Sequence, residues 1–283
     1  MQIYKSIEEL DSNAFRHIIA GAFFQMQKSC MLRVPEINTL VSGEILYVDV
    51  LPAPGNHQVI LSKQERQNLL KQLGAEHYLP VSVASWPQTL GYIRKRNKGS
   101  NGIYKGPFFL SGLNETGTDL HLMQSFLTFA FSDTSKFEWH HKLGYFYPLC
   151  GEVVYGNQMG RRMGYPTLNI KPLENQKLIP PMGVYSGLVK HKGNWYQSMI
   201  NIGIRPTLDL DKVTIEAHVF EFSGEIYGDE VTLHFTGRIR DEMKFPSLDS
   251  LKTQLKADQK AVLTALNTMN IDTATTEEFL LYK

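Results

Sequence analysis

The chain has 283 residues, of which 42% are hydrophobic and 20% charged, and its formal net charge is +1. This composition is typical of a globular protein of about two domains, and it argues against a disordered or fibrous chain. A dedicated binder of nucleic acid or anionic membranes usually has a larger positive surplus, so the charge balance leaves room only for a local basic patch.

Sparse cysteines and the lack of a recognisable signal peptide or membrane span point to the cytoplasm. Cys30 and Cys150 lie far apart, and no Cys or His spacing matches a zinc site, so a disulfide-stapled domain is not expected. The first 15 residues lack the apolar stretch of a signal peptide, and no run approaches the roughly 18 apolar residues of a membrane span. We therefore expect a cytoplasmic protein with no membrane partner.

The N-terminal half mixes strand-like and helix-like segments. Residues 44–51 alternate in polarity and are rich in β-branched side chains, which predicts a strand. Residues 62–73 predict a helix, because Ser62 can cap it, Glu65 can complete a capping box, and Gly74 fits its C-terminal end. Strands that alternate with helices indicate an α/β domain.

From Gly151 onward the chain changes to short strands separated by Gly, Pro, Asn and Asp, which is typical of a β-barrel or sandwich. The region closes with a predicted helix at residues 247–266. We place the domain boundary near Pro148, which divides the chain into domains 1–148 and 149–283. The strand candidates are residues 151–155, 183–190, 195–203, 213–222 and 229–236, and the apolar helix stripe is Leu248, Leu251, Leu255, Val262 and Leu266.

A glycine-rich segment opens this second half. Residues 151–170 contain four glycines, with Arg161 and Arg162 beside the third. Glycines let backbone N–H groups approach an anion, and arginine adds charge-assisted bonds to phosphate. The spacing matches neither a P-loop nor the dinucleotide fingerprint. From the residues alone, a phosphate-binding loop and ordinary turns between strands are both open interpretations.

Two further groups of polar residues follow. Thr167 and Asn169 are two apart, so an extended chain puts a hydroxyl and an amide oxygen on one face, as a hard cation requires. The alternative is a turn and a strand with two surface polar groups. In residues 213–220, Glu216 shares a face with His218 and Phe220, and its carboxylate could accept a proton from a substrate hydroxyl. The alternatives are a solvated glutamate and a structural histidine.

These features together resemble a known family. Residues 151–260 are similar to the riboflavin kinase (flavokinase) domain of the bacterial bifunctional riboflavin kinase/FAD synthetases. The landmarks occur in the order of the family. They are GEVVYGNQMGRRMGYPTLNI (151–170), PPMGVYSG (180–187), NIGIRPT (201–207), TIEAHVFEF (214–222), IYGDEVTLHF (226–235) and RIRDEMKFPSLDSLKTQLKAD (238–258).

The resemblance implies a fold and an activity. The expected fold is a six-stranded antiparallel Greek-key β-barrel with a C-terminal helix. The expected enzyme is a riboflavin kinase that binds riboflavin and ATP and releases FMN and ADP, with Mg²⁺ or another divalent cation as cofactor. The implied catalytic base is Glu216, the implied metal ligands are Thr167 and Asn169, the implied flavin-binding residue is Arg240, and the ATP- and phosphate-binding residues are Gly156, Gly160, Arg161, Gly164, Pro166, Thr167 and Asn169.

The N-terminal half resembles the FMN adenylyltransferase domain of the same family, a Rossmann-like nucleotidyltransferase fold, in a degenerate form. Residues 6–10, 61–81 and 137–154 carry the resemblance. The family motif GxFDGxHxGH is lost, because Phe24 stands at its Asp position and Gln27 and Cys30 stand at its His positions. The PHP segment reads PAP at residues 52–54, without its His, and the Ser/Thr-Arg motif is absent from the corresponding stretch at residues 131–139. We expect FMN adenylylation to be lost or weak; the alternative is a bifunctional enzyme that also makes FAD.

A basic loop in the N-terminal half supports a third hypothesis. Arg94, Lys95, Arg96 and Lys98 lie within a segment rich in Gly, Asn and Ser. A solvated surface loop is the favoured interpretation. The alternative is an anionic partner such as RNA, which would make the chain a flavin-responsive regulatory or RNA-binding protein.

Overall fold

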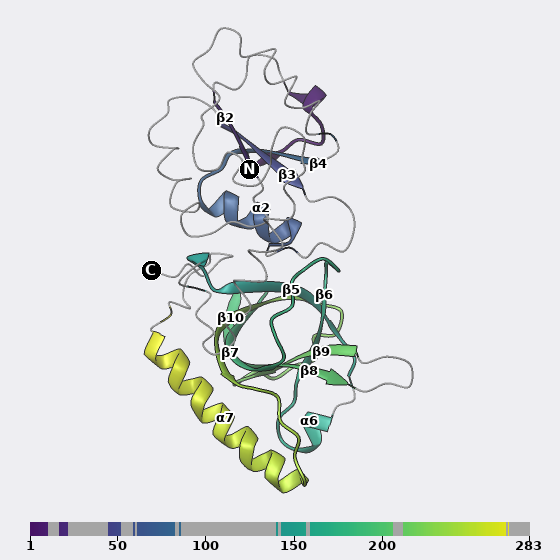
Figure 1. Cartoon of the computed structure of the whole chain (residues 1–283), viewed down its shortest axis with the longest axis vertical. Coiled ribbons are helices and arrows are strands. Elements are labelled where there is room, and N and C mark those ends of the chain that lie inside the picture. Colours follow the sequence, from purple (N-terminus) through teal and green to yellow (C-terminus); the bar gives the residue numbers. More distant parts are fainter. Residues whose placement is uncertain are drawn as a thin grey trace. The chain divides into compact units, whose positions relative to one another are not determined.

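A computed structural model describes residues 1–10, 17–21, 45–51, 59, 61–82, 85, 140, 143–156, 159–205, 212–269 and 271. The chain divides into two compact units (Figure 1). The first comprises Met1–Ser132, Lys142–Gly144 and Gln176–Leu178, and the second comprises Asp133–His141, Tyr145–Asn175 and Ile179–Lys283. The expected boundary after residue 148 stays a prediction.

The first unit contains a parallel sheet with the strand order β1-β4-β3-β2. Strand β3 pairs with β2 on one side and with β4 on the other, and helix α2 connects β3 to β4 (Figure 1). A helical crossover between adjacent parallel strands is the α/β unit that the sequence predicts. The elements are β1 (Gln2–Ile3), η1 (Ile7–Glu9), β2 (His17–Gly21), β3 (Ile45–Leu51), α2 (Lys63–Gln72) and β4 (His77–Ser82).

Helix α2 begins with the predicted capping box. The Ser62 hydroxyl accepts a hydrogen bond from the Glu65 backbone N–H at 3.3 Å, and the Glu65 carboxylate accepts one from the Ser62 N–H at 2.8 Å. The same carboxylate lies 2.6 Å from the Lys177 ammonium, and both side chains are buried. Gly74 follows the helix with a φ of +91°, which an L side chain adopts at a cost.

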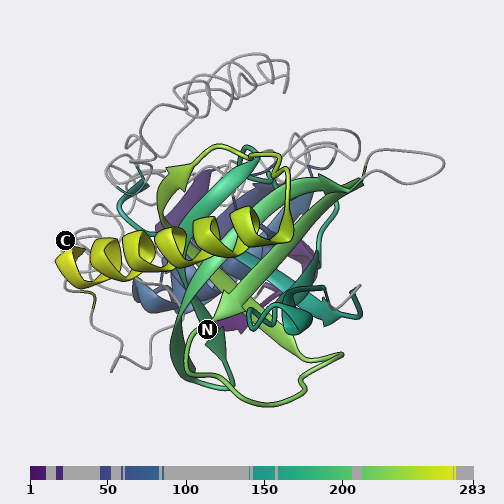
Figure 2. The same cartoon turned by 90° about the horizontal axis from the view of Figure 1, so that it is seen from below.

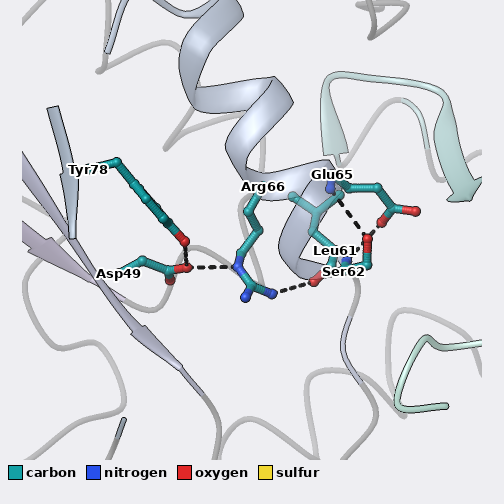
Figure 3. Close-up of polar contacts among 6 residues, drawn as sticks. All are labelled: Asp49, Leu61, Ser62, Glu65, Arg66 and Tyr78. Carbon is teal, nitrogen blue, oxygen red and sulfur yellow. Dashed lines mark hydrogen bonds and ion pairs between the residues drawn. The ribbon is translucent and has the colours of Figure 1, made fainter. Parts of the chain in front are cut away.

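A buried polar network fixes α2 to the sheet (Figure 3). The Arg66 Nε donates to Asp49 Oδ2 at 2.8 Å, and the Tyr78 hydroxyl donates to the same oxygen at 2.5 Å. A further Arg66 donor bonds the Leu61 carbonyl at 2.7 Å. Burial, together with the nearby Asp49 carboxylate, raises the pKa of Tyr78. The network therefore joins β3, β4 and α2 through three side chains that the sequence did not single out.

The second unit is a closed antiparallel barrel with the strand order β10-β5-β6-β9-β8-β7. Strands β7, β8 and β9 follow one another as neighbours, and β10 returns to pair with β7. This arrangement is a Greek key and confirms the expected six-stranded fold. The strands are β5 (Tyr147–Val154), β6 (Leu168–Pro172), β7 (Gly183–His191), β8 (Asn194–Arg205), β9 (Lys212–Val219) and β10 (Glu230–Arg240).

Helix α7 (Leu248–Met269) lies across the barrel strands and contacts β7, β8 and β10 (Figure 2). Val262 and Leu266 are buried in a cluster with Phe146 and other side chains of the barrel. The predicted apolar stripe is wrong at its first position, because Leu248 is 60% exposed at the start of the helix. None of the helices that the structure describes is long and apolar enough to cross a membrane.

Candidate active site

A cavity of about 290 Å³ opens in the second unit between the barrel and α7. Its walls come from the short helix α6 (Met159–Arg162), the segment that follows it, strands β7 to β10 and α7. Among the residues that sequence analysis singled out for a site, Gly160, Thr167, Glu216 and Arg240 line it. The full lining is Gly160, Met163, Tyr165, Thr167, Val184, Met199, Asn201, Glu216, His218, Arg240, Glu242, Met243, Phe245, Leu251, Leu255 and Asp258.

Three adjacent strands bring polar residues together at this cavity. In the ladders, Glu216 on β9 lies opposite Asn169 on β6 and opposite Asn201 on β8. Directly opposed residues in a sheet project to the same face, so the three side chains form one polar row. The Thr167 hydroxyl donates to Glu216 Oε2 at 3.1 Å. The structure therefore brings Glu216 next to Thr167 and Asn169, although Glu216 lies 49 residues after Thr167 in the sequence.

The histidine that follows Glu216 on the same face also bonds this region. His218 Nδ1 lies 2.7 Å from the Pro166 carbonyl oxygen. A carbonyl oxygen only accepts hydrogen bonds, so Nδ1 carries the proton. The imidazole packs between the rings of Tyr165 and Phe220, with centroids at 5.2 and 5.4 Å.

The glycines of the 151–170 segment allow close packing next to the polar row. A Cβ on Gly156 would lie 2.1 to 2.5 Å from the Asn169 side chain, so only a glycine leaves room for that amide. A Cβ on Gly160 would lie 2.2 Å from the Tyr165 carbonyl oxygen. Gly164 has a φ of +84°, which favours glycine at the turn between α6 and Tyr165.

The two predicted arginines have different environments. Arg161 is more than half exposed, lies 3.4 Å from Glu225, and is not among the described residues that line the cavity. Arg240 lines the cavity, but its guanidinium is bound to Asp258 on α7. The Arg240 Nε lies 2.9 and 3.0 Å from the two Asp258 oxygens, one terminal nitrogen lies 2.7 Å from Asp258 Oδ2, and the other donates to the Asp241 carbonyl at 2.7 Å.

Several lining residues had no role assigned from the sequence. Asp258 is the most informative of them, because it stands between Leu255 and Val262 at a position of the apolar stripe of α7. A buried aspartate at such a position requires a partner, and this was an available signal for the pairing with Arg240. Asn201 lies within one of the quoted motifs, yet only the strand register reveals that it opposes Glu216.

The cavity has a polar part and an apolar part. Thr167 and Glu216 line the cavity with oxygen ligands of the kind that Mg²⁺ prefers. Asn169 is not among the lining residues, but its amide lies opposite Glu216 in the ladder, in the space left by Gly156. Met243, Phe245, Leu251 and Leu255 supply apolar walls on the side of α7. The cavity therefore combines polar side chains with apolar walls, as small-molecule sites do.

Burial and hydrogen bonds hold the segment that precedes β7. The Tyr185 hydroxyl donates to the Pro181 carbonyl, and Arg238 donates to the Met182 carbonyl at 2.6 Å. Burial raises the pKa of Tyr185 to about 12, although the nearby Arg238 opposes this shift. The chain is thus fixed immediately before Val184, which lines the cavity.

Comparison with known proteins places this unit in a family. Residues 143–266 match the family model Flavokinase, described as riboflavin kinase. The chain is 41% identical over 117 residues to the bifunctional riboflavin kinase/FMN adenylyltransferase of Haemophilus influenzae, which is 41% of this chain and 37% of the relative. It is 34% identical over 124 residues to the protein of the same name from Bacillus subtilis, covering 43% of this chain and 39% of the relative. The chain thus matches less than two fifths of the length of these bifunctional relatives.

Another relative has a different name. The RNA-binding riboflavin kinase RibR of Bacillus subtilis is 34% identical over 139 residues, which is 47% of this chain and 57% of that protein. A crystal structure described as a macrolide-efflux protein from Streptococcus pneumoniae covers 93% of this chain and 98% of its own, with a TM-score of 0.75 and 24% identity. At this identity the structural similarity shows the fold alone.

The family match, the strand order and the quoted motifs agree. The matched residues include all six barrel strands, the cavity-lining residues and most of α7. The recognition made from the sequence is confirmed for this part of the chain. Residues 143–266 therefore form a flavokinase domain.

Proposed function

We propose that the chain is a riboflavin kinase, which transfers the γ-phosphoryl group of ATP to the ribityl 5′-hydroxyl of riboflavin and releases FMN and ADP. The observation that carries this proposal is the Thr167–Glu216 pair, 3.1 Å apart, in the cavity of a flavokinase domain. A carboxylate next to a hydroxyl and an amide is the arrangement that phosphoryl transfer to an alcohol needs.

Each residue has a defined task in this proposal. Glu216 accepts the proton of the 5′-hydroxyl while that oxygen bonds to the γ-phosphorus, and the bond from the γ-phosphorus to the β,γ-bridging oxygen breaks. A divalent cation, when bound, neutralises phosphate charge. Thr167 and Asn169 would hold it, and Gly156, Gly160, Arg161, Gly164 and Pro166 belong to the proposed ATP site. Most of the rate gain comes from positioning and from charge stabilisation, because the transferred group needs little covalent chemistry.

The flavin ring would occupy the apolar part of the cavity. Phe245, Leu251 and Leu255 provide surfaces for an aromatic tricycle. Arg240 keeps donors free beyond those bound to Asp258 and Asp241, and we propose that these face the flavin. We propose that the reaction takes place in the cytoplasm.

The direct test is a product assay with the full chain. Riboflavin, ATP and Mg²⁺ are incubated with the folded protein, and chromatography separates riboflavin, FMN and FAD. The proposal expects FMN and ADP in equal amounts. A folded sample that forms no FMN would disprove the activity.

The same assay tests the N-terminal half. Gln27 and Cys30 replace the histidines of the adenylyltransferase motif, and neutral side chains lack the positive charge that stabilises a phosphate in the transition state. These residues, the PHP-like segment 52–54 and residues 131–139 lie outside the described residues. We expect no FAD, and robust FAD formation from FMN and ATP would establish the bifunctional alternative.

RNA binding is a second candidate function, because one relative is named an RNA-binding riboflavin kinase. The basic residues Arg94, Lys95, Arg96 and Lys98 also lie outside the described residues. If the loop binds RNA, affinity should fall steeply with salt and should disappear when Arg94, Lys95 and Arg96 are replaced by Gln. RNA affinity that changes neither with salt nor with the Gln replacements would exclude RNA binding by this loop.

A further inference from the structure

The segment before β6 lacks support from the barrel ladder. Strand β6 begins at Leu168, which pairs with Ala217, so Pro166 and Thr167 precede the last described pair. Pro166 has no N–H to donate, and the extended pairing cannot continue through it. The position of the Thr167 hydroxyl therefore depends on side chains that reach this segment from elsewhere.

Strand β9 supplies two such side chains. Glu216 and His218 are two residues apart and share one face of the strand. Glu216 accepts from the Thr167 hydroxyl at 3.1 Å, and His218 Nδ1–H donates to the Pro166 carbonyl at 2.7 Å. Two hydrogen bonds from one strand thus hold two consecutive residues of the segment.

The imidazole is itself held in place. Its ring packs against Tyr165 at an interplanar angle of 59° and against Phe220 at 76°. The Tyr165 N–H bonds the Gly160 carbonyl at 2.9 Å, so the residue before Pro166 is anchored to α6. With the ring confined by two aromatic neighbours, Nδ1 is kept pointing at one backbone oxygen.

We propose that His218 is a positioning residue for the phosphoryl transfer, which it serves through the Pro166 backbone by fixing the Thr167 hydroxyl beside Glu216. This inference rests on the proposed function. The histidine takes no part in bond making. Groups that orient residues around a metal or phosphate typically matter by about 10- to 100-fold in activity or metal affinity.

Asn and Gln replacements of His218 test which of its two ring nitrogens is needed. In His218→Asn the amide nitrogen can occupy the place of Nδ1, whereas in His218→Gln it reaches the place of Nε2. We expect His218→Ala and His218→Gln to lower kcat about tenfold or more and to raise the Mg²⁺ concentration needed for the half-maximal rate, with little change in the KM for riboflavin. His218→Asn should recover most of the lost kcat. His191→Asn, which alters a histidine bonded to Asp229 outside the cavity lining, should retain the wild-type rate.

The outcomes distinguish the inference from the function on which it rests. No FMN from the wild type would overturn the proposed function. If the wild type is active, either of two results would overturn the inference alone. One is a kcat in all three His218 variants equal to that of the wild type. The other is recovery of kcat in His218→Gln but not in His218→Asn. A second measurement does not depend on activity or on variant folding. The ¹⁵N shifts of the neutral His218 ring should report the proton on Nδ1, and a proton on Nε2 would contradict the proposal.

Discussion

At the scale of single residues, three glycines allow the effect of backbone strain to be distinguished from the effect of site geometry. Gly164 and Gly193 share a φ of +84° and have open space where a Cβ would go, whereas a Cβ on Gly160 would meet the Tyr165 carbonyl oxygen at 2.2 Å. Gly164→Ala and Gly193→Ala should each cost roughly 1–2 kcal/mol of unfolding free energy through the left-handed backbone alone.

Gly160→Ala should act on the reaction. The added methyl group must displace the Tyr165 carbonyl, and with it Pro166 and Thr167, and a displacement of about 1 Å can cost 10²-fold in rate. We expect at least about a tenfold loss of FMN formation, with Gly193→Ala as the remote control. Equal rates for Gly160→Ala and Gly193→Ala would show that the Tyr165–Thr167 segment does not position the reacting groups.

Tyr185 is expected to make the folded protein less stable at alkaline pH. Its pKa is about 12 in the folded chain and about 10 when unfolded, chiefly because the phenol is buried. As the pH rises above 10, the unfolded chain loses this proton first, so the stability that the neutral phenol contributes is lost between pH 10 and 12. Urea unfolding at pH 9 and pH 11 should show a larger loss for wild type than for Tyr185→Phe. Equal losses of unfolding free energy in wild type and Tyr185→Phe would show that Tyr185 does not cause the alkaline destabilisation.

At the scale of elements, an ion pair adds to the apolar packing of Val262 and Leu266 in attaching α7 to the barrel. Asp258 is 2% exposed and Arg240 is 17% exposed, and three short N–O distances join them. Removing one partner of such a pair leaves a charge without compensation, at a cost of about 3 kcal/mol.

Asp258→Ala should therefore destabilise the second unit by about 3 kcal/mol and raise the KM for riboflavin, because Leu251 and Leu255 on α7 line the cavity. The control is Asp249→Ala, an exposed aspartate in the first turn of the same helix, with an expected cost below about 1 kcal/mol. Urea unfolding monitored by circular dichroism measures both. Equal costs for the two variants would show that the pair does not hold α7.

Local signals in the sequence predicted the elements that depend on local physics. The capping box of Ser62 and Glu65 placed the start of α2, and alternation placed β3 and β9 within a few residues. Contacts between segments that are distant in the sequence could not be predicted from local signals. Nothing near Asp49 in the sequence indicates Arg66 and Tyr78 as its partners, and the distance from Arg161 to Glu225 depends on how the chain folds back. The family resemblance, not periodicity, predicted the closure of the barrel and assigned Thr167 and Glu216 to one site, whereas the hydrogen bond between them appears only in the structure.

At the scale of the whole molecule, the cavity and the buried network belong to different units. Every described residue that lines the cavity lies in the second unit. The Asp49–Arg66–Tyr78 network lies in the first. We therefore expect that a substitution in the network changes the stability of the first unit without changing the proposed chemistry of the second.

Arg66→Met should lower the unfolding free energy of the first unit by about 3–5 kcal/mol, because the buried Asp49 carboxylate loses the Arg66 guanidinium. Lys71→Met, on an exposed position of the same helix, is the control. Thermal unfolding measures stability, and at a temperature where the variant is folded FMN formation should match wild type. A rate that falls in Arg66→Met but not in Lys71→Met would show that the first unit contributes to the reaction.

The central claim is that the carboxylate of Glu216 serves phosphoryl transfer. The decisive measurement compares the rate of FMN formation by Glu216→Gln with that of Glu230→Gln, an exposed glutamate on β10 outside the cavity lining. Glutamine keeps the shape but cannot accept the proton, so Glu216→Gln should lose at least about 100-fold in kcat while riboflavin and ATP still bind. Glu230→Gln should behave as wild type. Full turnover by Glu216→Gln would contradict the account.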